Sequence, residues 1–277
     1  MKFKKSILFI SIISCALSTI AQNQKIIKLW ETDSTFKIPE SVLYSPEENL
    51  LYVSNIDGKS NEKDLKGSIT KMSIDGKSIT HRWAINLSSP KGMAIFDKNL
   101  YVADLDEVVI LDLNNGRTLK RIPIEGSIFL NDLTINKQGI IYVSDSRTGK
   151  VHQIKNNNVS TYLENKNSVN GLLADGDELY LLVKDTLFKS DKNNMLTVIT
   201  TGLDESSDGI IQTSNKDFIV SCWNGIIYYV KNDGNKEVLL DTRAQKINTA
   251  DIGFDAVKSI LYVPTFFKNK VIAYQLK

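Results

Sequence analysis

One strand-rich unit recurs six times along the chain, at a spacing of about forty residues. Each copy contains an apolar strand, a turn, a second strand of the Leu-Tyr-Val type, a glycine-containing turn and a third strand. The second strands are centred on residues 51–53, 100–102, 141–143, 179–181, 218–220 and 261–263. Because β-branched and aromatic residues between short turns favour strands, this repeat predicts an all-β, six-bladed β-propeller. Its four-stranded antiparallel blades would surround a central channel.

The first and last segments of the repeat array predict how the ring closes. Residues 25–30 form an apolar stretch before the first full repeat, and the chain stops directly after residues 273–276. An open sheet edge invites association with another chain. We therefore expect the N-terminal strand to complete the last blade.

The extreme N-terminus has the pattern of a signal peptide over residues 1–21, with Lys2, Lys4 and Lys5 before the apolar run 7–13. This run is too short and too interrupted to span a bilayer. We expect cleavage before Gln22, export to the periplasm or the medium, and one propeller domain over residues 22–277. Residues 12–15 also resemble a lipobox, in which Cys15 would be lipidated. The apolar residues after Cys15 favour the first interpretation.

Charge and cysteine content narrow the classes of partner. Three of the 34 basic residues lie in the predicted signal peptide, so 31 remain against 32 acidic residues. A nearly neutral chain without a basic, aromatic stripe gives no basis for nucleic-acid binding, so a small molecule is the expected partner.

Cys222 alone would remain after cleavage, which excludes an intramolecular disulfide, and we expect it to be a small buried apolar residue.

Each repeat opens its first strand with a polar residue, ten to twelve positions before the Leu-Tyr-Val core: Glu40, Lys91, Asn131, Asn170, Asp208 and Asp251. The innermost strands of a propeller surround one channel, so these side chains should converge there. Asn170-Gly171 and Asp208-Gly209 could instead be hairpin-turn dipeptides, but their register places them before an inner strand. A merely solvated axis is the remaining alternative to a binding site.

Glu40, Asn170 and Asp208 are predicted to bind a metal. Carboxylate and amide oxygens are hard donors, which favour Ca²⁺ first and also suit Mg²⁺ or Mn²⁺. Lys91 in the same ring would repel a cation, so we expect it to pair with Asp251 or to contact an anionic ligand.

These residues give the chain a resemblance to the senescence marker protein/gluconolactonase/regucalcin family of six-bladed propellers. The resemblance covers nearly the whole predicted mature chain as a blade pattern. Its most specific pieces are Pro39-Glu40-Ser41-Val42, Asn131-Asp132, Val169-Asn170-Gly171-Leu172 and Asp208-Gly209. It implies that Glu40, Asn170 and Asp208 hold one divalent metal, and that Asn131 and Asp132 lie beside it and place the substrate.

The reaction implied by the resemblance is hydrolysis of a lactone or related ester, with Asp208 or Asp132 accepting a proton. Asn131 and Lys91 would contact the substrate. The chain departs from the family at Phe129, where an arginine is usual. The alternative function is a non-catalytic propeller that binds a small ligand or a protein partner.

Two further sets of residues have structural interpretations. Asp104 and Asp145 follow second strands, where an aspartate commonly caps the next turn. Trp223 and the run Thr265-Phe266-Phe267 follow later second strands. Aromatic residues at such places could line a pocket mouth, but we expect burial between blades.

Overall fold

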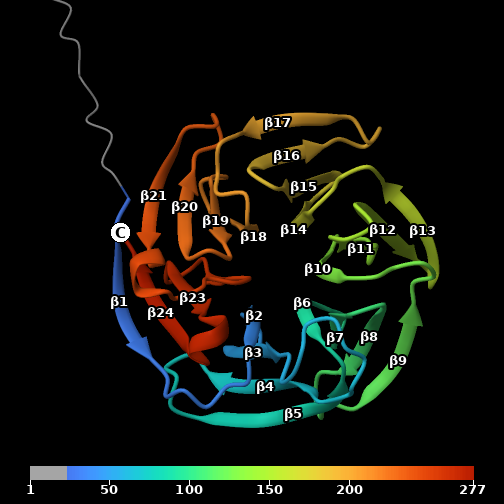
Figure 1. Cartoon of the computed structure of the whole chain (residues 1–277), viewed down its shortest axis with the longest axis horizontal. Helices are drawn as coiled ribbons and strands as arrows, with labels where there is room; N and C mark the ends of the chain where they lie inside the picture. The colour runs from blue at the N-terminus through green and yellow to red at the C-terminus, as the bar shows by residue number, and fades with distance from the viewer. Residues whose placement is uncertain (1–23) are drawn as a thin grey trace, which may run out of the picture.

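A computed structural model describes residues 24–277 as six four-stranded antiparallel sheets arranged as a ring (Figure 1). The predicted six-bladed β-propeller is confirmed. The predicted signal peptide, its cleavage before Gln22 and lipidation of Cys15 all concern positions outside the described residues.

The first three blades each follow the chain from the channel outwards. The first contains β2 (Pro39–Ser45), β3 (Leu50–Asn55), β4 (Gly67–Ser73) and β5 (Ile79–Leu87). The second contains β6 (Pro90–Phe96), β7 (Asn99–Asp104), β8 (Glu107–Asp112) and β9 (Thr118–Pro123). The third contains β10 (Leu130–Ile135), β11 (Ile141–Asp145), β12 (Lys150–Lys155) and β13 (Asn158–Leu163).

The next two blades repeat this order, and the sixth is assembled from both ends of the chain. The fourth contains β14 (Val169–Asp175), β15 (Glu178–Val183), β16 (Thr186–Ser190) and β17 (Leu196–Thr200). The fifth contains β18 (Ser207–Gln212), β19 (Phe218–Cys222), β20 (Ile226–Val230) and β21 (Lys236–Asp241). The sixth contains β22 (Gly253–Asp255), β23 (Ile260–Pro264), β24 (Val271–Leu276) and β1 (Ile26–Glu31). Two short 3₁₀ helices, η1 (Arg243–Gln245) and η2 (Phe266–Lys268), lie in connections.

The ring closes at two places. At its periphery β1 pairs antiparallel with β24, as predicted, with Ile26 opposite Leu276 and Glu31 opposite Ile272 (Figure 1). Beside the channel, the Asp251 N–H donates to the Glu40 carbonyl at 2.9 Å, and the Val42 N–H donates to the Asp251 carbonyl at 3.1 Å. Backbone hydrogen bonds therefore join the two ends of the chain within the sixth blade, and they also join the first and sixth blades beside the channel.

The core lies between neighbouring blades, where the second and third strands of each repeat contribute fully buried side chains. Leu100, Val102, Val109 and Leu111, for example, pack with Tyr52 and Ile69 of the preceding blade. Cys222 is buried in the equivalent cluster around the fifth blade, as expected. No helix among residues 24–277 is long and apolar enough to cross a membrane.

Candidate functional site

The inner strands of five blades break their regular pairing at the residue predicted to face the channel. The register of each inner strand against its neighbour shifts between Pro39 and Ser41, Pro90 and Met93, Leu130 and Leu133, Val169 and Leu172, and Ser207 and Ile210. A β-bulge changes the direction of a side chain and is frequent near active sites. The bulges thus coincide with Glu40, Lys91, Asn131, Asn170 and Asp208.

Serine hydroxyls on the second strands support three of these bulges. The Ser54 hydroxyl accepts the Ser41 N–H at 2.9 Å, and the Ser144 hydroxyl accepts the Asp132 N–H at 2.9 Å. Ser221 does the same for the Gly209 N–H, also at 2.9 Å. The backbone N–H that the bulge removes from the strand pairing is therefore satisfied inside the protein.

Polar residues at the ends of the second strands fix the loops that lead into the channel. Asp104 accepts the N–H groups of Ser88 and Ser89, three and two residues before Lys91. Asp145 accepts those of Ile128 and Phe129, and it also caps the following turn through Arg147 and Thr148. The predicted capping of the following turn is confirmed for Asp145 and was wrong for Asp104, whose carboxylate accepts, among the described residues, only from the loop before Lys91.

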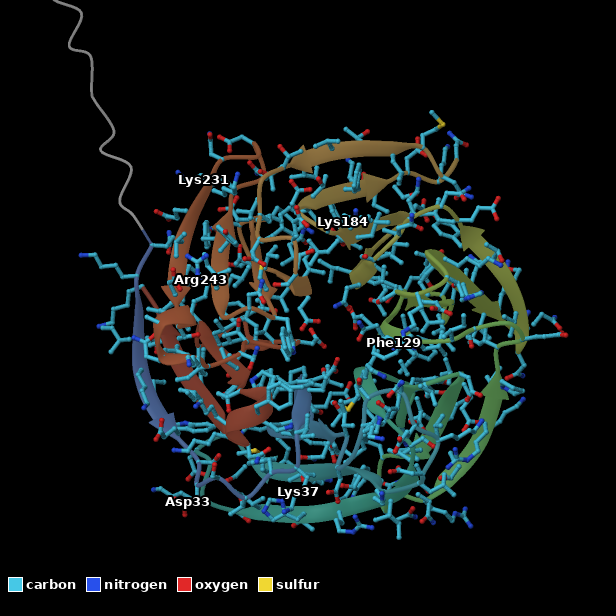
Figure 2. The ribbon with its side chains drawn as sticks, in the orientation of Figure 1. Asp33, Lys37, Phe129, Lys184, Lys231 and Arg243 are labelled. Atoms are coloured by element: carbon cyan, nitrogen blue, oxygen red, sulfur yellow. The ribbon has the colours of Figure 1, made fainter. Side chains whose placement is uncertain are left out.

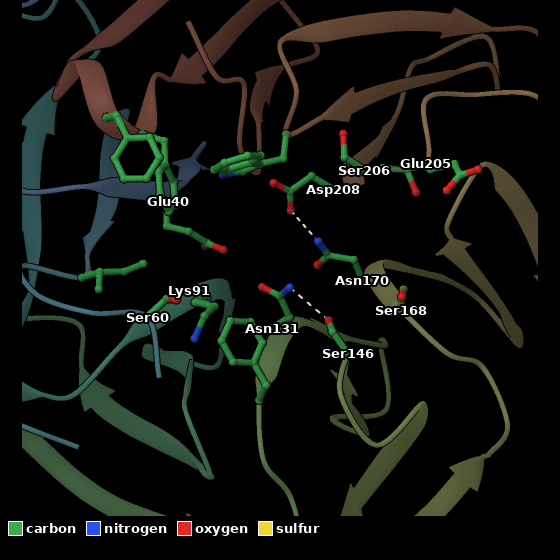
Figure 3. A pocket seen from close by; sticks show the side chains of 16 residues that line it. Glu40, Ser60, Lys91, Asn131, Ser146, Ser168, Asn170, Glu205, Ser206 and Asp208 are labelled. Atoms are coloured by element: carbon green, nitrogen blue, oxygen red, sulfur yellow. Dashed lines mark hydrogen bonds between the residues drawn. The ribbon is translucent and has the colours of Figure 1, made fainter. Parts of the chain in front are cut away.

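Five of the six predicted channel residues line one cavity of about 440 Å³: Glu40, Lys91, Asn131, Asn170 and Asp208. Figure 3 shows the side chains of Glu40, Asn131, Asn170 and Asp208 facing a common space from different blades. Asp251 is absent from this lining. Its carboxylate accepts the Ser41 hydroxyl at 2.5 Å and lines a second cavity of about 300 Å³, bounded by the inner strands of all six blades.

Asp132 also lies in the second cavity. One of its carboxylate oxygens accepts the Leu133 N–H and the other accepts the Leu172 N–H, each at 2.6 Å. Asp132 therefore ties the third blade to the fourth. Of the two acids predicted to accept a proton, only Asp208 lines the main cavity.

The main cavity contains acceptor oxygens without donors. Among the described residues, Glu40 Oε2, Asn131 Oδ1 and Asn170 Oδ1 are buried and receive no hydrogen bond. The amide nitrogens of both asparagines are engaged, Asn131 Nδ2 by the Ser146 hydroxyl at 3.1 Å and Asn170 Nδ2 by Asp208 Oδ1 at 2.7 Å (Figure 3). These contacts leave the amide oxygens unpaired, and buried polar atoms rarely remain so without a partner.

Burial makes the acids of this cavity reluctant to ionise. The pKa of Glu40 lies well above its usual range because of burial and repulsion by Asp208, although Lys91 opposes the rise. Burial and repulsion by Asp251 likewise raise the pKa of Asp208, against the hydrogen bond from Asn170. A divalent cation would relieve both effects, and the unpaired oxygens are the hard donors that Ca²⁺ prefers. Within residues 24–277, no group of three or more His, Cys, Asp or Glu side chains is arranged so that it could hold a metal ion.

Lys91 does not pair with Asp251, so the first of the two alternatives expected for this residue was wrong. Its ammonium, 1% exposed, donates to the Ser89 carbonyl and hydroxyl at 3.0 and 3.1 Å. It lies 4.3 Å from the centre of the Phe129 ring, and the Arg147 guanidinium lies 4.9 Å from that centre. Burial lowers the pKa of Lys91 to about 8, although attraction by Glu40 opposes the fall. Figure 2 shows Phe129 near the inner rim of the ring, and Arg147 was not identified from the sequence.

The aromatic residues after the later second strands also differ from expectation. Phe266 is buried, but Trp223 is only half-buried and Phe267 is 60% exposed. All three line the main cavity. The expected burial between blades was wrong for Trp223 and Phe267, because the connections carrying them extend past the blade ends to the cavity mouth.

Comparison with solved structures finds the same propeller in proteins of low sequence identity. A gluconolactonase from Xanthomonas campestris superposes with a TM-score of 0.72 at 15% identity, over 91% of this chain and 89% of that one. Regucalcin, a calcium-binding protein from Agrobacterium tumefaciens, gives 0.66 at 15% identity, over 88% and 91%. The fold matches that of the gluconolactonase and regucalcin propellers.

The same fold also occurs in another enzyme class. A virginiamycin B lyase from Staphylococcus aureus superposes with a TM-score of 0.65 at 11% identity, covering 91% of this chain and 99% of the lyase. No family model and no curated protein matches the sequence. Since propellers serve many functions, the functional argument depends on the cavity.

Proposed function

We propose that this chain is an exported hydrolase that requires a divalent metal and opens a lactone or related cyclic ester. The observation that carries the proposal is the set of unpaired acceptor oxygens on Glu40, Asn131 and Asn170, which line one cavity with Asp208. The resemblance of the sequence to lactonases and the fold shared with a gluconolactonase and a calcium-binding protein support it.

Glu40, Asn170 and Asp208 would hold the metal, with Ca²⁺ the first choice and Mg²⁺ or Mn²⁺ the alternatives. When bound, the cation would supply positive charge that polarises a carbonyl and stabilises the oxyanion. Asn170 has a second function, because its amide nitrogen orients the Asp208 carboxylate at 2.7 Å. Ser146 holds the Asn131 amide in the same way, so that its oxygen faces the cavity.

The remaining steps belong to side chains of the chain itself. Asp208 would accept a proton from the attacking water as the new C–O bond forms. The ring C–O bond then breaks, and the leaving alkoxide takes the proton back from Asp208 to give a hydroxy acid. Lys91, held by Ser89 beside Phe129, would attract the negative charge of the substrate or of the product carboxylate.

Elemental analysis of the purified chain with residues 1–21 removed, combined with a pH-stat assay of lactones, tests the proposal. We expect about one divalent metal per chain, lost in Asp208→Ala and retained in Asp177→Ala, an exposed turn residue between β14 and β15. The parent should release acid from lactones, and Asp208→Ala should not. A protein that retains calcium yet opens no lactone would be a ligand-binding propeller, and a protein without metal would contradict the site itself. Cell fractionation of the full-length chain tests export.

A further inference from the structure

The main cavity is lined by both polar and apolar side chains. Besides the polar channel residues and Phe129, which lies beside Lys91, four apolar side chains line the same 440 Å³ space: Ile56, Trp223, Phe266 and Phe267. We call these four residues the apolar wall. They come from three different connections between strands, and none of them takes part in the proposed bond-breaking steps.

The aromatic part of the apolar wall is packed into a fixed arrangement. The Phe266 and Phe267 ring centres are 4.7 Å apart, and their planes meet at 89°. Trp223 lies 5.5 Å from Phe266 and 5.9 Å from Phe267, again edge to face. These are favourable geometries for aromatic pairs. Phe266 also packs against Ile56 and Ala250 beneath the surface. The wall is therefore preorganised, which favours ligand binding.

The backbone at Phe266 supports a functional interpretation. This residue has a φ of +45°, in the left-handed region that a bulky side chain rarely adopts. Its partner Phe267 remains 60% exposed at the cavity mouth. Unfavourable backbone conformations concentrate at ligand-binding and active sites. Here the conformation places two aromatic rings beside a cavity, and a bound apolar group would cover the exposed ring of Phe267.

Three serines that line the cavity offer no free hydroxyl proton to a ligand. The hydroxyl of Ser146 donates to the Val169 carbonyl, and that of Ser206 donates to Asp204. The Ser207 hydroxyl donates to the Lys184 carbonyl. These three cavity residues have therefore already used their donors within the protein.

We infer that the apolar wall binds an alkyl or aryl substituent of the substrate, so that the preferred lactones are hydrophobic rather than sugar-derived. This inference rests on the proposed hydrolase function and specifies its substrate class. A δ-lactone carrying a side chain would place its carbonyl among Glu40, Asn131 and Asp208, with the side chain against Trp223 and Phe267.

The kinetic test compares δ-valerolactone, its pentyl- and heptyl-substituted homologues, and glucono-δ-lactone. Each methylene buried against the wall should raise kcat/KM about fourfold, so the pentyl compound should exceed δ-valerolactone by at least about 30-fold if half of its chain is covered. In Phe267→Ala this ratio should fall about tenfold. Val257→Ala, which truncates a side chain that is 94% exposed outside the cavity, should leave the ratio unchanged. A preference for glucono-δ-lactone, or a ratio unaffected by Phe267→Ala, would overturn the inference.

A binding measurement separates this inference from the proposed hydrolysis. The probe is the pentyl-substituted δ-lactam, which is not hydrolysed under the assay conditions, and the signal is tryptophan fluorescence, with Trp223→Phe used to assign the change to Trp223. We expect the dissociation constant to rise about tenfold in Phe267→Ala and not in Val257→Ala. If no lactone is opened but the lactam binds in this manner, the hydrolase proposal fails and the apolar subsite stands. Absence of binding to the parent refutes the subsite.

Discussion

The Asp208 carboxylate should affect stability in two opposite ways: as a buried charge it destabilises the metal-free chain, and as a ligand it stabilises the metal-bound chain. Replacing Asp208 with asparagine should separate these two contributions. The substitution keeps the side-chain size and leaves an amide oxygen to accept the 2.7 Å hydrogen bond from Asn170 Nδ2. It removes one negative charge from a group that is 3% exposed and whose pKa burial and repulsion by Asp251 hold well above the usual range. Without metal, the variant should therefore be more stable than the parent.

With metal, the order should reverse. A ligand that binds only the folded chain at one hundred times its dissociation constant adds about 2.7 kcal/mol to the free energy of unfolding. For a domain of this size, 1 kcal/mol moves Tm by about 2–4 °C, so saturating Ca²⁺ should raise the Tm of the parent by about 5–10 °C. In Asp208→Asn, the loss of a charged ligand should reduce this rise to about 1–2 °C or less.

Thermal unfolding followed by differential scanning fluorimetry measures both effects, first in EDTA and then with Ca²⁺, Mg²⁺ or Mn²⁺ in excess. Asp177→Asn is the matched control, because it removes the same charge from an exposed turn and should behave like the parent in both conditions. Equal stabilisation of the parent and Asp208→Asn by every cation would show that Asp208 is no ligand. A parent that no cation stabilises would remove the basis for a metal site in the channel.

Three other perturbations test the fold. Deleting residues 22–32 removes β1 from the sixth blade and should lower Tm by more than about 5 °C, and a deletion variant with unchanged Tm would contradict closure by β1. In urea unfolding, Gly171→Ala should cost about 1–3 kcal/mol, because the new Cβ would meet the backbone carbonyl of Asp208. Gly58→Ala serves as the control, because its new Cβ would meet only the movable carboxylate of Asp64. Equal losses of unfolding free energy in the two variants would show that the close approach of Gly171 to Asp208 does not limit stability. Burial lowers the pKa of His152 in the folded chain. Below about pH 6.5, the usual pKa of an exposed histidine, the unfolded chain therefore binds more protons than the folded chain. The parent should lose stability relative to His152→Leu from pH 7 to 5, and parallel curves would refute this.

The fold was predictable because the spacing of the repeats shows where each strand lies within its blade. Six Leu-Tyr-Val type strands, spaced by about forty residues in units of several short strands, are typical of a six-bladed propeller. The same counting located the inner-strand residues, since each lies at a nearly constant distance before its second strand. Closure by residues 25–30 followed from the same reasoning, because the sixth repeat lacks its outermost strand.

The direction of side chains along the inner strands was not predictable in this way. A regular strand sends neighbouring residues to opposite faces, so the sequence alone does not separate the roles of Asn131 and Asp132. The bulge between Leu130 and Leu133 places Asn131 in the main cavity and Asp132 in the second one. The serines that support such bulges, Ser54, Ser144 and Ser221, are a recognisable sequence signal one position after the apolar core.

The glycines after the channel residues show why local dipeptide rules fail in a propeller. Asn170-Gly171 and Asp208-Gly209 have the composition of hairpin turns, yet both lie at bulged starts of inner strands, in β14 and β18. A Cβ at residue 171 would meet the Asp208 carbonyl, and one at residue 209 would meet the Asp251 carboxylate. Glycine is needed there because adjacent blades converge most closely at the channel. The resulting close approach brings Asn170 within hydrogen-bonding distance of Asp208, so the packing constraint of the ring also assembles the proposed metal site.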